Sequence, residues 1–411
     1  MATGPSPQLI LPPEAQWGPT FDAARATDAY VATIPAAERE KSDTYFEGGY
    51  WIEAWGTLVT VLVAWLLLRT RFSARLRDFA ERRARRPFRQ TLIYGAIFLL
   101  AVSLLTLPWT LYTEFYREHQ YGMSNQTLGA FLGDWSKNLA LGTALGALAI
   151  ALLYLIVQRV RERWVWWATG ATALFLLFMI LIYPVFVAPL FNKYESLPPG
   201  EVRESILALA RENGVPADDV YWYDASKQTK RISANVSGIA GTTRIALNDN
   251  LLNGTSPEEI RAVMAHEMGH YIFNHSLWRP LGLSLLFGIG FWAVNRLFGH
   301  FQRKQGERWG VRDLADPAGL PLAMAIFGVV MLLLGPLNKS IIRVAENQAD
   351  AFGLDAAREP HGFASVAMRL APYRKIEPAA LEEILFFDHP SGRTRVERSM
   401  RWLAEHPPQA P

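Results

Sequence analysis

The chain has 411 residues, of which 50% are hydrophobic and 12% aromatic, and it contains no cysteine. The absence of cysteine excludes disulfide scaffolds and thiolate metal sites, so any zinc site must use histidine and carboxylate ligands. The formal net charge is only +3, and the basic residues gather in short segments beside apolar runs. This distribution is typical of a membrane protein and argues against a nucleic-acid partner.

The N-terminal half of the sequence predicts a polar arm followed by membrane helices. Residues 1–48 are polar, rich in Pro and Ala, and lack the layout of a signal peptide. Residues 49–190 contain four apolar runs, and residues 278–338 contain two more that form a hairpin. Each run can approach or cross a bilayer of ~30 Å at ~1.5 Å per residue. The six predicted spans are 50–68, 91–112, 138–158, 165–188, 279–299 and 317–337.

A water-soluble segment at 191–277 separates the fourth and fifth apolar runs. It shows a helical pattern, a strand candidate at 220–223, and two strand-like pieces, 232–239 and 243–247, around a turn at Gly241. Residues 339–404 predict further helices of the same unit, and residues 405–411 a loose tail. The predicted fold class is therefore mainly α: a polytopic helical membrane protein with a small α+β domain carrying a short hairpin or sheet.

The soluble segment ends in the motif H-E-x-x-H at 266–270. On a helix, positions four apart share one face, so His266 and His270 can hold the same metal ion. Glu267 lies beside them, close enough to act on a water molecule activated by that metal. His275, five residues further on, is expected to be structural or interfacial.

The residues before this motif favour the start of a helix. Thr255 or Ser256 can cap it, and Pro257 suits its first position. Glu258 and Glu259 then fall at the positive end of the helix dipole.

Two histidines need a third ligand, because catalytic zinc sites usually have three protein ligands and one open position. Glu346 and Asp350 lie four residues apart on a predicted downstream helix, and the hairpin can return them to the motif. Glu346 would ligate, and Asp350 would hydrogen-bond a ligand histidine and fix its tautomer. His389, or an arginine nearby such as Arg395, is a candidate donor to the oxyanion of a hydrolytic reaction.

Several ordered motifs in the chain resemble the type I CAAX prenyl proteases, which are integral-membrane zinc metallopeptidases, and their bacterial relatives. The likeness runs from about residue 28 to 402. Besides H-E-x-x-H, it is carried by LPWTLY at 107–112, NQTLG at 125–129, APLFNK at 188–193, SK at 226–227, RIAL at 244–247, ENQADAF at 346–352 and HP at 389–390. The eukaryotic members have one more N-terminal membrane helix and a longer linker between residues 235 and 244.

The resemblance implies a role for each site residue. One zinc ion per chain would be held by His266, His270 and Glu346, with Glu267 as the catalytic base. Asp350 and Arg395 would support the site, and His389 would stabilise the oxyanion. An edge strand around Asn235, with its neighbours Ala234 and Val236, would take the substrate by β-addition. The family fold is a ring of membrane helices around a large water-filled chamber.

The predicted function is that of a membrane zinc endopeptidase acting on membrane-associated, possibly prenylated, peptides or proteins. A quality-control protease for misfolded membrane proteins is the alternative within the enzyme class. From a different class, the chain would be a non-catalytic chamber that binds lipidated peptides around a structural zinc. The sequence leaves the oligomeric state open and suggests a bacterial inner-membrane protein.

The side of the membrane that carries the motif stays open between two arguments. The loop at 69–90 contains nine Arg and two acids, the loop at 159–163 three Arg, and the loop at 301–316 four basic residues. With six spans these loops share one side, which the positive-inside rule makes cytoplasmic, so the motif would face the periplasm. The family resemblance instead favours the cytoplasmic face.

Overall fold

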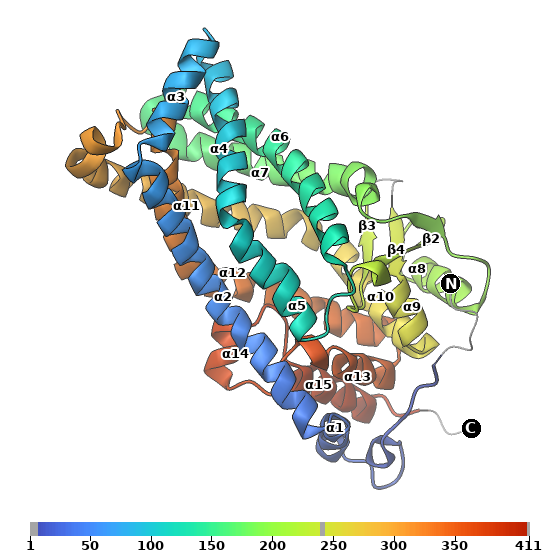
Figure 1. Ribbon diagram of the computed structural model, residues 1–411. Helices are drawn as coiled ribbons and strands as arrows, with labels where there is room; N and C mark the ends of the chain where they lie inside the picture. The colour runs from blue at the N-terminus through green and yellow to red at the C-terminus, as the bar shows by residue number, and fades with distance from the viewer. Residues whose placement is uncertain (1–6, 239–242, 409–411) are drawn as a thin grey trace.

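The computed structural model describes residues 7–238 and 243–408, and six long helices dominate it (Figure 1). They are α2 (Ala36–Arg69), α4 (Pro87–Thr110), α6 (Leu128–Val160), α7 (Trp164–Ile182), α11 (His275–Trp309) and α12 (Leu320–Ala357). Each packs against the next in this order, and α12 packs against α2, so the six helices close a ring. The ring confirms the predicted polytopic helical fold.

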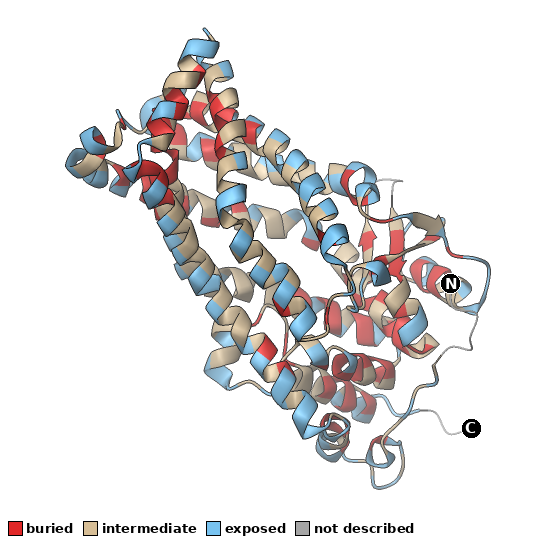
Figure 2. Ribbon diagram, in the orientation of Figure 1, coloured by how far each residue is buried: buried red, intermediate tan, exposed pale blue. Residues whose placement is uncertain are grey.

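The long helices expose apolar side chains, as a bilayer requires. Within the described residues, five helical stretches are apolar and long enough to cross a membrane, and only 11–33% of the most apolar part of each is buried. One stretch, Leu128–Leu190, has 63 residues. At ~1.5 Å per residue it would extend for about 95 Å, three bilayer thicknesses, so it crosses twice, as α6 and α7. Figure 2 shows that buried residues gather where the sheet and shorter helices pack together, whereas the long helices carry many exposed and partly exposed residues.

Two predicted boundaries fall inside continuous helices. The polar arm was expected to end at residue 48, but α2 runs from Ala36 into the membrane without a break. The hairpin was expected to end at residue 338, but α12 continues past it to Ala357. A change from apolar to polar residues marks where a helix leaves the bilayer, and it does not end the helix. The consequence for the site is that Glu346 belongs to the same continuous helix as a membrane span.

Most of the remaining elements surround one end of the ring, whereas the segment from residue 72 to 83 packs at the other end. The shorter helices are α1 (Ala23–Ala32), α3 (Phe72–Arg83), α5 (Arg117–Gln120), α8 (Glu201–Glu212), α9 (Asp249–Gly254), α10 (Pro257–Ile272), α13 (Pro360–Arg369), α14 (Ala380–Phe386) and α15 (Gly392–Glu405). The short 3-10 and π segments include η8 (Ala371–Tyr373) and η7 (Pro317–Gly319). The helices of the ring also line an apolar cavity of about 550 Å³, with walls from α2, α6, α7, α11 and α12.

A four-stranded sheet covers α10. Its strands are β1 (Tyr194–Ser196), β2 (Val220–Tyr223), β3 (Ala234–Ser237) and β4 (Arg244–Asn248), in the order β1-β2-β4-β3. β2 and β4 are parallel, and the other two pairs are antiparallel. The predicted strand at 220–223 and the predicted 232–239/243–247 hairpin are confirmed, with β3 at the edge. The turn predicted at Gly241 lies outside the described residues.

Helices α10 and α12 approach each other closely because glycines line their crossing. A Cβ on Gly269 of α10 would lie 3.0 Å from the Cα of Ala349, and one on Gly353 of α12 would lie 3.1 Å from the backbone N of His266. The buried Met264 and Met268 of α10 and Leu354 of α12 belong to one hydrophobic core. This packing fixes the separation between the histidines on α10 and Glu346 on α12.

Replacing Gly353 by Ala is therefore expected to destabilise the protein by about 1–3 kcal/mol, the usual cost of overpacking a close contact. The new methyl group would lie 2.5 Å from Cζ of Phe363 and close to the backbone of His266. Gly335→Ala is the matched control on α12, since a Cβ there meets nothing within 4 Å. Thermal unfolding in detergent should show a lower Tm for the first variant alone, and equal Tm values would contradict this account of the crossing.

Candidate metal centre

Helix α10 starts at a complete capping box. The Ser256 hydroxyl accepts from the backbone N–H of Glu259, and the Glu259 carboxylate accepts from the N–H of Ser256 at 2.7 Å. Of the two predicted caps, Ser256 is therefore the one used, and Pro257 occupies the first helical position. Glu259 is fully buried and also accepts from Nε of Arg369 on α13 at 2.5 Å. These contacts anchor the start of the helix that carries the motif.

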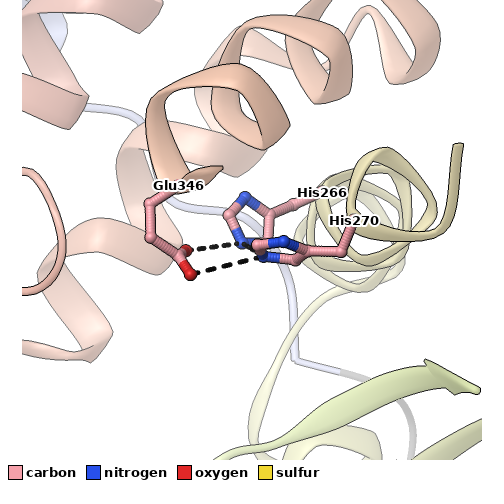
Figure 3. A group of neighbouring side chains, drawn as sticks. All are labelled: His266, His270 and Glu346. Carbon is pink, nitrogen blue, oxygen red and sulfur yellow. Dashed lines mark hydrogen bonds and ion pairs between the residues drawn. The ribbon is translucent and has the colours of Figure 1, made fainter. Parts of the chain in front are cut away.

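His266, His270 and Glu346 converge on one point (Figure 3). Their ligand atoms all lie within 4.8 Å of one another. Nε2 of His266 lies 3.1 Å from Nε2 of His270 and 3.2 Å from Oε2 of Glu346, and Nε2 of His270 lies 3.5 Å from Oε1 of Glu346. The structure thus brings together three predicted residues, of which the first and the last are 80 positions apart in the sequence.

The chemistry of these atoms fits a divalent cation. Oε2 of Glu346 is shielded from water and has no well-aligned hydrogen-bond donor within the part of the chain that the structure describes, although Nε2 of His266 and Nε2 of His389 each lie 3.2 Å away. A buried carboxylate oxygen without a donor is costly unless a cation compensates it. Two imidazole nitrogens facing each other and one carboxylate form the His–His–acid set typical of a catalytic zinc site.

Asp350 and Arg395 support this group from behind. Oδ1 of Asp350 lies 2.9 Å from Nδ1 of His266, and Nε of Arg395 donates to Oδ2 of Asp350 at 2.9 Å. The Asp350 contact occupies the ring nitrogen of His266 that faces away from Glu346, which is the arrangement predicted for a supporting carboxylate. Arg395 therefore contacts Asp350 and not Glu346. Of the two residues predicted as oxyanion donors, only His389 contacts Glu346 directly.

His389 approaches the same oxygen of Glu346 as His266 does, with its Nε2 3.2 Å from Oε2 of that residue. Its Nδ1 lies 2.7 Å from Oδ1 of Asp388, and this contact orients the ring. Burial lowers the pKa of His389, and the nearby Arg374 guanidinium lowers it further.

Glu267 and the edge strand complete the set of predicted residues. Glu267 is partly exposed on α10, and burial raises the pKa of its carboxyl group against the opposing effect of the two histidines. Strand β3 packs against α10. Val236 is buried, whereas Ala234 and Asn235 are partly exposed.

His275, Asp388 and Arg279 contact the site without having been predicted in it. Nδ1 of His275 lies 2.7 Å from Nδ1 of His270, while its Nε2 lies 3.0 Å from the amide oxygen of Gln348. Nη1 of Arg279 lies 3.7 Å from Oε1 of Glu346. The sequence contains a hint for His275, which lies five residues past His270, and for Asp388, which directly precedes His389.

In the metal-free chain His266 holds a proton at neutral pH. Burial alone would lower its pKa, but the carboxylates of Asp350 and Glu346, which lie 2.9 and 3.2 Å from its two ring nitrogens, outweigh burial and raise the pKa to about 9. A metal ion must displace this proton, so metal binding is weaker wherever the proton is bound, below that pKa.

The apparent affinity of the metal-free protein for zinc is therefore expected to rise about thirtyfold from pH 7.0 to pH 8.5, tenfold per pH unit. Competition with a chromophoric chelator at both pH values measures this change. Calorimetry in buffers of different ionisation enthalpy should also show a proton released at pH 7. Equal affinities at the two pH values would contradict the contacts described for His266.

Two protein-family profiles match the chain. Residues 23–193 match the family described as "CAAX prenyl protease N-terminal, five membrane helices", and residues 196–403 match "Peptidase family M48". The uncharacterized metalloprotease YhfN of Bacillus subtilis (strain 168) is 30% identical over 319 residues, which are 76% of this chain and 74% of that protein. CAAX prenyl protease 1 of Saccharomyces cerevisiae is 30% identical over 283 residues, 64% of this chain and 61% of that protein.

The fold is shared with a solved structure. The crystal structure of S. mikatae Ste24p superposes with a TM-score of 0.70 at 23% sequence identity, covering 90% of this chain and 89% of that one. The match therefore includes both the ring of long helices and the part that holds the three converging residues.

Proposed function

Because the chain belongs to peptidase family M48 and is a multi-pass membrane metalloprotease, we propose that it holds one zinc ion on His266, His270 and Glu346 and cleaves peptide bonds of membrane-associated substrates. The observation that carries this proposal is the convergence of these three side chains, in which Oε2 of Glu346 has no well-aligned hydrogen-bond donor. When bound there, zinc supplies a Lewis acid that activates water and polarises a carbonyl group.

The surrounding residues have separate tasks in this proposal. Glu267 takes a proton from the attacking water and delivers it to the leaving amine, a transfer for which its raised pKa is suited. Asp350 holds the imidazole of His266, and Arg395 holds Asp350. His389, oriented by Asp388, donates to the oxyanion that forms at the scissile carbonyl.

The substrate backbone is proposed to add to β3, the edge strand of the sheet. The backbone N–H of Asn248 donates to the carbonyl of Ser233 at 2.9 Å, so the Ser233–Asn248 pair is hydrogen-bonded. Hydrogen-bonded pairs alternate along an antiparallel ladder. The backbone groups of Asn235 therefore face β4, and those of Ala234 and Val236 face the open edge, where a peptide strand can pair with them.

The names of the relatives suggest prenylated CAAX-type peptides as substrates. The experiment that tests the function is cleavage profiling of the purified, zinc-loaded protein on prenylated peptides and on their unprenylated counterparts. Preferential cleavage of the prenylated set supports this substrate class. Equal cleavage of both sets favours quality control of membrane proteins instead, and no cleavage of either contradicts the proposed activity.

The metal centre is proposed to face the outer side of a bacterial inner membrane. The three basic loops contact one another: Arg312 in the third loop donates to Glu81 in the first at 2.7 Å, and Gln158 at the end of α6 donates to the carbonyl of Ala315. They thus share one side, which the positive-inside rule makes cytoplasmic. A C-terminal fusion to a reporter that works only in the cytoplasm should be inactive, and an active fusion would overturn this orientation.

A further inference from the structure

Helix α14 presents its apolar side chains outward and its acidic side chains inward. Leu381 and Ile384, three positions apart on one helix face, are 66% and 54% exposed. The two acids between them, Glu382 and Glu383, are only partly exposed. A helix on a water-facing surface shows the opposite pattern, with its apolar face against the core and its charges in solvent. The exposed face of α14 therefore suits an apolar medium better than water.

The two acids of α14 find their partners inside the protein. The carboxylate of Glu382 accepts from the Tyr50 hydroxyl of α2 at 2.9 Å and from Nζ of Lys375 at 3.0 Å. The carboxylate of Glu383 accepts from the backbone N–H of Ser391 at 3.0 Å. These contacts fix the rotation of α14 about its own axis, so its apolar side cannot turn inward without breaking them.

Further contacts fasten α14 to two helices of the ring. It packs against α12, where Nη1 of Arg343 donates to the carbonyl of Glu383 at 2.8 Å. The ring of Phe386 stacks on that of Tyr50 in α2, with centroids 4.0 Å apart. Figure 1 shows α14 at the left margin of the molecule, beside α2. The helix is thus held at the periphery of the ring.

The outward face of α12 is apolar and exposed as far as the turn that contacts α14. Glu346 marks the opposite face, the one directed to the metal centre. At about 100° per residue, Leu337 lies about 180° around the helix from Glu346, and Val344 about 160°. Both side chains are half exposed. The surface that α12 presents to the bilayer therefore continues beyond residue 337 to Val344, next to the arginine that holds α14.

The same level of α2 carries aromatic residues typical of a bilayer boundary. Trp51 and Trp55 are exposed and lie within two turns of Tyr50, which contacts α14. Between them, Glu53 accepts from Nζ of Lys339 on α12 at 2.7 Å, so α2 and α12 are at one height here. Tryptophan is enriched where membrane hydrocarbon meets the headgroups. The contacts of α14 therefore place it at this boundary.

We propose that α14 is an interfacial membrane anchor, with Leu381 and Ile384 inserted among the lipid acyl chains on the metal-centre side of the membrane. The partner is the lipid bilayer itself, because the apolar face of α14 adjoins the bilayer-facing surface of α12. His389, three residues after the end of α14, lies 3.2 Å from Glu346. The anchor therefore also holds the segment of His389 at a fixed depth. This inference goes beyond the proposed peptidase function and does not depend on it.

The test uses the absence of cysteine, which allows a single labelled position in each variant. Leu381→Cys and Ile384→Cys, each carrying an environment-sensitive fluorophore, are reconstituted in vesicles of phosphatidylethanolamine and phosphatidylglycerol. Lipids with nitroxides at different depths should place both labels about 5–10 Å into the boundary between headgroups and acyl chains. Leu333→Cys is the reference in the bilayer, and Arg401→Cys, with a side chain 68% exposed on α15, is the reference in water.

Aqueous iodide is expected to quench the labels on α14 several-fold less than the label at Arg401. Iodide quenching as strong as at Arg401 would overturn the inference. Shielding from both iodide and nitroxide lipids would also overturn it, because a second copy of the chain or another protein would then cover α14. A wild-type Tm shows that a labelled variant is folded, and either position alone decides. No outcome involves cleavage, so failure here leaves the proposed function standing.

Discussion

Glu267→Gln is expected to lower peptide cleavage by about a hundred- to ten-thousandfold, the contribution of one positioned general base. The amide keeps the size of the side chain but cannot take a proton from the attacking water. His266, His270 and Glu346 are unchanged, so the variant should retain its zinc. Cleavage rates and zinc content of the same preparation give both values.

Glu258→Gln is the control, because it makes the same change on the same helix away from the converging residues. Zinc retained with cleavage lost separates the protease from a non-catalytic chamber, since a purely structural zinc site has no need of a base. Unchanged cleavage in Glu267→Gln would remove Glu267 from this role.

Glu346→Gln is expected to release the metal as well as to stop cleavage. The uncharged amide is a poor ligand, and only two histidines remain, so the loss of zinc affinity should exceed the ~10- to 100-fold that removal of a supporting residue typically costs. Zinc content after dialysis, measured by mass spectrometry, and the cleavage rate test this expectation.

Asp355→Asn is the matched control on α12, where Asp355 accepts from the Trp402 indole at 2.7 Å. A Glu346→Gln protein with full zinc occupancy and wild-type affinity would show that Glu346 is not a ligand.

Local sequence patterns predicted the parts of the fold that depend on local chemistry. The H-E-x-x-H spacing and the Ser256 cap define α10, and apolar runs define the six helices of the ring. The spacing of Glu346 and Asp350 required only that both lie on one helix face. The packing of that helix face against α10 depends on tertiary structure. The glycines at the α10–α12 crossing allow the two helices to approach closely enough for it.

The geometry of the turn between α10 and α11 and the pairing of the shortest strand were beyond the sequence. His275 reaches His270 because Asn274 adopts a left-handed conformation, with φ 54°, that redirects the chain between α10 and α11. The three-residue strand β1 exists only through pairing with β2.

The most direct test of the metal centre is a chelation and reconstitution titration of the full-length protein in detergent. We expect the chelated protein to lose cleavage of a membrane-peptide substrate, and one equivalent of zinc per chain to restore it, with no restoration in Glu346→Gln. Cleavage that persists in fully metal-free protein, or restoration of Glu346→Gln at the same zinc concentration, would contradict the assignment of His266, His270 and Glu346 as the catalytic metal site.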